Sequence, residues 1–135
     1  MGAWGVLAFD NDQANDWAYD LEDRDDLSLV EEAFEAVENI DGYLDSGEAC
    51  NALAACEVLA RLHGKPGYKN AYTKKVDEWV AARSLELSPE LLARANGAID
   101  RILSDDSELK ELWAESDTYA RWMESVEDLR QRMGT

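Results

Sequence analysis

Apolar residues recur at helical spacing from residue 12 almost to the end of this chain. The first four fall at i, i+3, i+4 and i+7, and they are Ala14, Trp17, Ala18 and Leu21. Asp12 stands in position to cap the helix, because its side chain can accept a hydrogen bond from a free backbone N–H of the first turn. The pattern therefore predicts a first amphipathic helix that begins near residue 12.

A second apolar stripe follows a capping-box pattern formed by Ser28 and Glu31, in which each side chain bonds to the backbone N–H of the other residue. The stripe repeats at intervals of three and four residues, through Val30, Phe34, Val37 and Ile40. The spacing predicts a second helix with one apolar and one acidic face.

Residues 45–63 are apolar around nearly the whole circumference of a helix and are rich in small side chains. A helix that is apolar on all sides is buried, so we expect this segment to be the central helix. Gly64 and Pro66 then supply a C-cap and a stop.

Further helices are predicted near residues 72–84, from Ser88 and Pro89 onward, around Leu109 to Trp113, and from Thr118 to the end. Residues 1–9 show no such period and are expected to form an extended N-terminal arm. The sequence predicts one all-α domain spanning residues 1–135. This domain is a compact bundle of about six or seven helices around the central helix at about 45–63.

The net charge of −17 is unevenly spread. Residues 1–60 hold 16 acidic residues against one basic residue, a balance of −15, and residues 61–135 hold 14 against 12, a balance of −2. Within the second half, the segment Arg61 to Arg83 carries six basic and two acidic residues, which is +4. An acidic field of this kind repels nucleic acid and anionic lipid and attracts basic partners, although solubility alone also explains it.

No pattern of catalytic or metal-binding residues stands out. The single histidine, His63, follows Cys56 by seven residues, about 10 Å along a helix, so the two cannot form a dyad within it. Cys50 and Cys56 point to different faces and cannot form a disulfide with each other. We expect no catalytic residues, no metal and no cofactor. Since the chain lacks both an apolar run of 18 residues and a signal-peptide start, we also expect no membrane association and a cytoplasmic location.

Glu57 is the most informative single residue, because it lies within the predicted buried helix. Arg61 is placed one turn later, where it can form a structural ion pair with Glu57. The alternative is a carboxylate in a pocket with a raised pKa. Trp4, between Gly2 and Gly5, is expected to anchor the N-terminal arm on the core.

The opening Gly-Ala-Trp-Gly at residues 2–5, with Phe9, Asn11, Asp12, Ala14, Asp16 and Trp17 after it, resembles the signature of a bacterial family, domain of unknown function 4259 (DUF4259). The helix with Ala52, Leu53, Ala54, Ala55, Glu57, Val58 and Ala60 is also similar to that family's central helix. The resemblance covers essentially the whole chain. It implies a small, mostly bacterial cytoplasmic protein and assigns no activity.

Charge and motif content favour a non-enzymatic interaction module over an enzyme. The leading hypothesis is an inhibitor, an immunity-type protein or a nucleic-acid mimic whose acidic half binds a basic protein. Its expected binding residues are Asp16, Tyr19, Asp20, Asp23, Asp25 and Asp26. Exposed aromatic residues such as Tyr19 or Tyr43 are expected to supply contact area.

Two alternatives remain open at this point. One is a small ligand-binding or enzymatic domain with a carboxylate-lined pocket around Glu57 and residues 10–16. Its expected lining is Trp4, Asp10, Asn11, Asp12, Glu57 and Arg61. The other is a homo-oligomer in which the acidic half of one copy meets the segment Arg61 to Arg83 of another.

Overall fold

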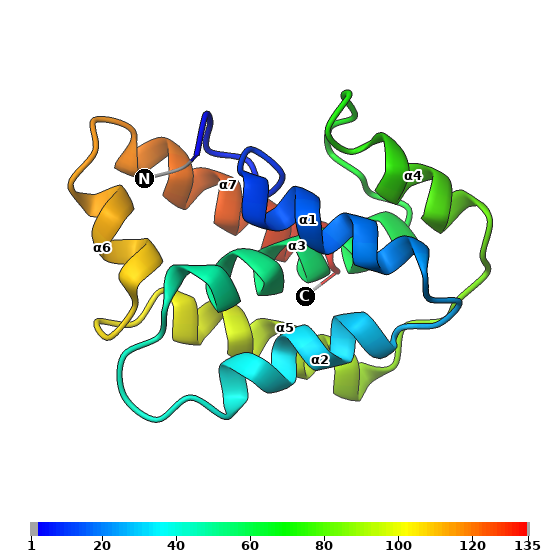
Figure 1. Cartoon of the computed structure of the whole chain (residues 1–135), viewed down its shortest axis with the longest axis horizontal. Helices are drawn as coiled ribbons and strands as arrows, with labels where there is room; N and C mark the ends of the chain where they lie inside the picture. Colours follow the sequence, from blue (N-terminus) through cyan, green and yellow to red (C-terminus); the bar gives the residue numbers. More distant parts are fainter. Residues whose placement is uncertain (1–2, 135) are drawn as a thin grey trace.

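The computed structural model describes residues 3–134, and within that range the chain forms seven helices and no β-strand (Figure 1). The helices are α1 Asp12–Glu22, α2 Ser28–Glu38, α3 Ser46–Leu62, α4 Lys74–Ala81, α5 Pro89–Ile102, α6 Glu108–Ala114 and α7 Tyr119–Arg132. The predicted all-α fold is confirmed. None of the helices in the described part is both long and apolar enough to cross a membrane.

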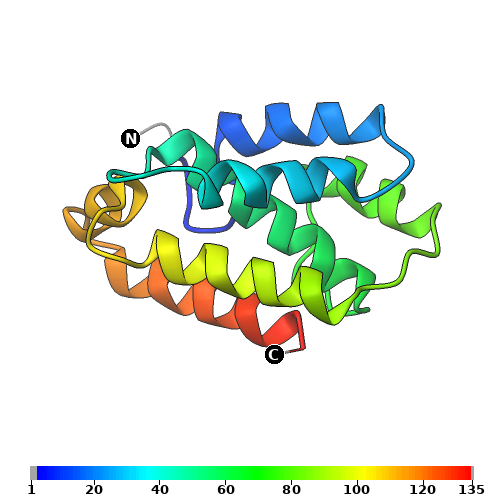
Figure 2. The same ribbon diagram turned by 90° about the horizontal axis from the view of Figure 1, so that it is seen from below.

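Helix α3 lies at the centre and packs against each of the other six helices. Seen from the side, α1 and α2 cover one flank of α3, and α5 and α7 run next to each other along the other (Figure 2). Small side chains allow neighbours to approach α3 closely from several directions, and Ala52, Ala54 and Ala55 are fully buried. The central position predicted for this helix is therefore confirmed.

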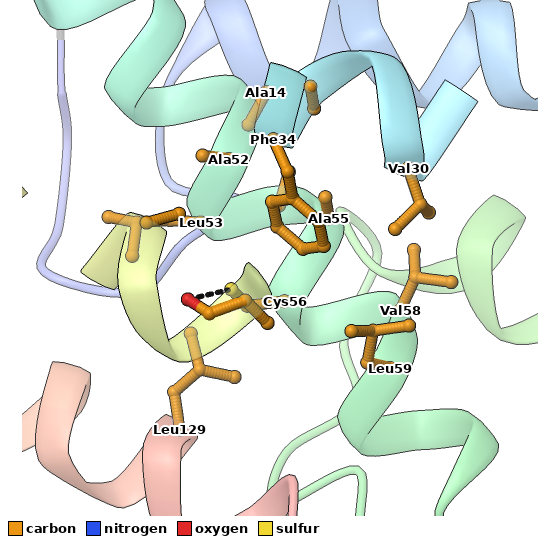
Figure 3. Close-up of a cluster of buried hydrophobic side chains, with 14 of the residues drawn as sticks. Ala14, Val30, Phe34, Ala52, Leu53, Ala55, Cys56, Val58, Leu59 and Leu129 are labelled. Atoms are coloured by element: carbon orange, nitrogen blue, oxygen red, sulfur yellow. Dashed lines mark hydrogen bonds between the residues drawn. The ribbon is translucent and has the colours of Figure 1, made fainter. Parts of the chain in front are cut away.

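The core forms where the flanking helices insert large side chains against α3. Phe34 of α2 and Leu129 of α7 approach α3 from opposite flanks, and Val58 and Leu59 of α3 are fully buried between its neighbours (Figure 3). Burying one such side chain stabilises the fold by about 1.5–3 kcal/mol. Cys56 behaves as a small apolar residue here, with its sulfur 4.0 Å from the carbonyl oxygen of Ala95.

Two predicted helix caps are wrong. Helix α1 is capped by Asn11, whose Oδ1 accepts from the backbone N–H of Ala14 at 2.8 Å, and Asp12 is already inside the helix. Helix α2 has Leu27 at its N-cap and no side-chain cap, so Ser28 and Glu31 form no capping box. The reason is that the N–H of Ser28 is already bound by Asp26 in the preceding turn, which moves the start of the helix back by one residue.

Two other helix boundaries differ from the prediction. Helix α2 ends at Glu38, so Ile40 lies beyond it, half-buried against the core. Helix α4 begins at Lys74 rather than near residue 72, because the side chain of Asn70 accepts from the N–H groups of Tyr72 and Thr73 and holds them in a turn.

The N-terminal arm folds back on itself. Ala3 pairs with Asn11 across an isolated bridge, and the N–H of Trp4 donates to the carbonyl oxygen of Asp10 at 2.9 Å. Phe9 is fully buried and attaches this loop to the core, whereas Trp4 is 49% exposed and packs on the ring of Tyr72, with 5.0 Å between ring centroids. The prediction that Trp4 anchors the arm on the core is therefore wrong.

Gly5 permits this fold of the arm, because a Cβ at that position would overlap the Asp10 carboxylate. Gly2, the other glycine beside Trp4, lies outside the described residues.

Candidate functional site

Glu57 is buried on α3, only 2% exposed, and is bound by two arginines. Arg61, one turn later, donates from Nη1 to Oε1 of Glu57. Arg132 of α7 donates from Nη1 to Oε1 at 2.9 Å and from Nη2 to Oε2 at 2.8 Å. The predicted ion pair with Arg61 is confirmed. The second partner was not predicted, since the sequence shows Arg132 only as a basic residue at a helix end.

The two arginines extend the network to the surface. Arg61 Nε lies 2.8 Å from Asp77 Oδ1, and Arg132 Nε lies 2.7 Å from Asp128 Oδ2. Burial by itself would lower the pKa of Arg132, but the hydrogen bonds that Arg132 donates to Glu57 and Asp128 raise it overall. Glu57 therefore accepts three N–H donors on its two oxygens and lies between two arginine side chains. These contacts favour a structural role for Glu57 over acid or base chemistry.

The same two arginines hold the connection between α3 and α4. Arg132 Nη1 donates to the carbonyl oxygen of Pro66 at 2.9 Å, and Arg61 Nη2 donates to that of Tyr68 at 2.7 Å. Gly67 has φ of +71°, and a Cβ there would lie 2.6 Å from Arg132 Nε. The connection can therefore lie flat on Arg132 only with glycine at this position.

A partly open cavity of about 340 Å³ lies beside this network, between the N-terminal loop, the first half of α3, and helices α6 and α7. Its wall is mostly apolar and contains Val6, Leu53, Leu112 and Leu129. Trp113 and Trp122 also line it, and their rings stack with centroids 6.0 Å apart and planes at 11°.

Three of the six residues predicted for a pocket line this cavity, namely Asn11, Asp12 and Glu57. Trp4 and Arg61 do not, and Asp10 instead accepts from the N–H of Leu7 at 3.1 Å. Asp12 is exposed and therefore lies at the opening.

The tryptophans of α6 and α7 were not predicted as lining residues. They lie 51 and 60 residues beyond the end of α3, so no spacing in the sequence connects them with the cavity.

The lining residues between 3 and 134 include one thiol and no histidine. Cys50 lines the cavity, and burial raises the pKa of its thiol to about 11, so the thiol stays protonated at neutral pH. The single histidine, His63, is exposed at the far end of α3 and is not among the lining residues. In the described part of the lining, therefore, no side chain offers an activated nucleophile with a base beside it.

A second candidate site is the outward side of α1, which we call the acidic face of α1 and define by Asp12, Asp16, Tyr19, Asp20 and Asp23. All five side chains are exposed. Asp12, Asp16 and Asp20 are spaced one turn apart in a row, and Tyr19 is 59% exposed. Among residues 3–134, no ion pair joins Asp16, Asp20 or Asp23 to a basic side chain.

The other predicted binding residues are placed differently. Asp25 and Asp26 are exposed in the connection that follows α1. Asp25 pairs with Arg83 at 3.0 Å, and the pKa of Asp26 is lowered by its hydrogen bonds with Ser28. Tyr43 is 52% exposed but donates its hydroxyl to Glu111 of α6, which raises its pKa to about 12. Tyr43 therefore belongs to the α6 side of the molecule.

The basic segment Arg61 to Arg83 is partly used within the chain itself. Arg61 is bound to Glu57, Arg83 pairs with Asp25, and Lys75 places Nζ 4.0 Å above the ring of Tyr19. Three basic residues of the segment stay exposed, and they are Lys65, Lys69 and Lys74.

Together the fold and these sites define a small, acidic, all-helical protein with an apolar cavity and an acidic helix face. The chain belongs to the family described as Domain of unknown function (DUF4259), whose model matches residues 2–125. This confirms the resemblance seen in the sequence. A search of curated proteins and a search of solved structures each find no match.

Proposed function

We propose that this protein is a non-enzymatic interaction module that binds a basic protein through the acidic face of α1 and the adjoining Asp25 and Asp26. An inhibitor, an immunity-type protein or a nucleic-acid mimic would act in this way. The observation that carries the proposal is the set of exposed carboxylates at Asp16, Asp20 and Asp23, which no ion pair in the described range neutralises.

The placement of these carboxylates opposes the stability of α1. Asp12 and Asp16, like Asp16 and Asp20, are like charges at i,i+4, and each such pair costs about 0.2–0.5 kcal/mol. Asp20 lies in the last turn of α1 and Asp23 is its C-cap, where the helix dipole disfavours negative charge. Solubility needs surface charge but does not require it at these positions. An unfavourable local arrangement is expected where function maintains it.

Tyr19 adds the apolar contact area that charge alone does not supply. Long-range attraction mainly speeds association, while buried aromatic side chains give much of the affinity of an interface. The ring of Tyr19 already accepts one cation on its face, Lys75 of the same chain. A partner that presents Lys or Arg side chains is therefore matched in both charge and ring chemistry.

The proposal is tested by capture from a lysate of the encoding organism with tagged wild type and two triple variants. One variant, D16N/D20N/D23N, removes three charges from α1. The other, E115Q/E124Q/E127Q, removes three exposed charges at the end of α6 and on α7 and serves as the matched control. We expect the wild type and the control to retain the same basic protein and the α1 variant to lose it. Equal retention by all three would refute the proposal.

Self-association of the chain must be distinguished from binding of a different basic protein. If a second copy is the partner, the wild type sediments as an oligomer at low salt and as a monomer at high salt without any other protein. The interaction proposal requires instead that the purified chain sediments as the same species at both salt concentrations.

The second candidate, a carboxylate-lined pocket, receives support from one observation. The cavity reaches Asn11, Asp12 and Glu57, as that hypothesis requires. Its enzymatic form is disfavoured because Arg61 and Arg132 occupy both oxygens of Glu57. Binding of a ligand does not depend on a free Glu57.

A further inference from the structure

We propose that the cavity between the N-terminal loop, α3, α6 and α7 binds a small aromatic molecule of about two fused rings, neutral or positively charged. The cavity shares one residue, Asp12, with the acidic face of α1. The inference does not require that face to bind a protein, because the binding of the rings rests on the shape and apolar lining of the cavity.

The size of the cavity sets the size of the ligand. Packed protein interiors leave few voids larger than a water molecule. A cavity of about 150 Å³ binds benzene in another protein, and this one measures about 340 Å³. Space of about twice that volume suits a two-ring molecule such as a naphthalene or an indole derivative.

The stacked rings of Trp113 and Trp122 indicate an aromatic ligand. Both side chains are buried, 7% and 2% exposed, yet both line the cavity, so aromatic side chains border the free space. Aromatic rings pack well against such walls in offset or edge-to-face arrangements. The remaining wall is aliphatic and includes Val6, Leu53 and Leu129.

Charge on the lining disfavours an anionic ligand. Among residues 3–134, the lining contains two carboxylates, Asp12 and Glu57, and no Lys, Arg or His side chain. Glu57 is neutralised by its arginines, whereas Asp12 is exposed at the opening with Gln13 beside it in the chain. A ligand that places its rings against the apolar interior and an ammonium or hydroxyl group beside Asp12 at the opening matches the chemistry of both parts of the cavity.

Gly47 provides a way to close the site without damage to the fold. It lies in the first turn of α3 on the cavity lining, and a Cβ there would approach Gln13 Oε1 at 3.8 Å, an ordinary contact. G47L therefore extends an aliphatic side chain into the opening and also removes a glycine from a helix, which favours folding. Gly97 of α5 is the matched control, because a Cβ there meets no described atom within 4 Å and Gly97 is not on the lining.

The experiment measures binding of three probes with the same ring by isothermal titration calorimetry. The probes are naphthalenemethanol, naphthylmethylamine and naphthoate, which are neutral, cationic and anionic. For naphthalenemethanol, we expect the wild type and G97L to have the same affinity. The same equality between the two proteins is expected for naphthylmethylamine. G47L is expected to bind at least about tenfold more weakly, and naphthoate to be at least about tenfold weaker than naphthalenemethanol on the wild type.

Proton–nitrogen spectra of the wild type locate the probe without any variant. The indole N–H signals of Trp113 and Trp122 should shift with added naphthalenemethanol, while that of Trp79, which is not on the lining, should not. The proposal is overturned if the wild type binds neither naphthalenemethanol nor naphthylmethylamine, if G47L binds as the wild type does, or if the signals of Trp113 and Trp122 do not move. Preference for naphthoate would overturn the assigned ligand class.

Discussion

Replacing Glu57 by glutamine should destabilise the fold more than any other loss of one carboxylate from its network. E57Q keeps the shape of the side chain but leaves Arg61 and Arg132 facing each other across a neutral amide. Breaking a buried pair by removing one partner costs about 3–5 kcal/mol. Arg61 keeps its ion pair with Asp77, and Arg132 keeps its ion pair with Asp128. E57Q therefore removes only the central, buried charge of the network.

The outer carboxylates supply a graded comparison. The side chains of Glu57, Asp77 and Asp128 are 3%, 16% and 62% exposed. D128N should cost about 0.2–1 kcal/mol, as for a surface ion pair. D77N, at a carboxylate that is mostly screened from water, should cost about 1–3 kcal/mol. The order of the three losses thus follows the burial of the carboxylate.

Urea unfolding followed by tryptophan fluorescence measures these differences in the free energy of unfolding. The control is E127Q, an exposed residue of α7, which should change stability by less than about 0.5 kcal/mol. The double variant E57L/R132M removes both sides of one ion pair and should recover part of the loss seen in E57Q. Equal losses for E57Q and D128N, or no loss for E57Q, would refute the reasoning.

Two further predictions concern backbone geometry and a helix start. G67A should destabilise the protein by more than G64A, because both glycines have positive φ but only at Gly67 does a Cβ meet Arg132. G64A should cost about 1–2 kcal/mol. Equal losses of the free energy of unfolding in urea would contradict this prediction. E108Q should weaken the cap that Glu108 forms on the N–H of Ser46, a hydrogen bond that lowers the pKa of Glu108 below its ordinary 4.5. Its stabilisation is present above pH 4.5 and is lost as the pH falls through the lowered pKa, so the difference between wild type and E108Q should shrink between neutral and strongly acidic pH.

The sequence was sufficient to predict the order of the helices and many core positions. In most of the helices, the buried side appears as apolar residues repeated every three or four positions. Ala14 and Trp17 of α1, and Val30 and Phe34 of α2, are buried as their spacing predicted. Helix α3 lacks a clear polar side. This feature predicted its central position, which the structure confirms.

The capping residues were less predictable because they depend on the turn that precedes each helix. Asn11 and Asp12 can both cap a helix, and only the fold of the N-terminal loop, which places the carbonyl oxygen of Ala8 within 3.1 Å of Asn11 Nδ2, selects Asn11. Trp4 likewise suggested an anchor by its size, whereas Phe9 occupies the core.

The two candidate sites also differ in how far they could be predicted from the sequence. Asp16, Tyr19, Asp20 and Asp23 are neighbours on one helix, so the sequence was sufficient to group them. The cavity joins four segments far apart in the chain, and the pairing of Glu57 with Arg132 spans 75 residues. Contacts between distant segments follow from packing and leave no local pattern.

The most direct test of the proposed function is the rate of association with the captured basic partner, measured at about 50 mM and about 200 mM salt. If the carboxylates of α1 attract that partner, the association rate constant of the wild type should fall steeply with salt, and that of D16N/D20N/D23N should be lower and change little. A rate constant that is independent of salt, or that is unaffected by the three substitutions, would contradict the central claim.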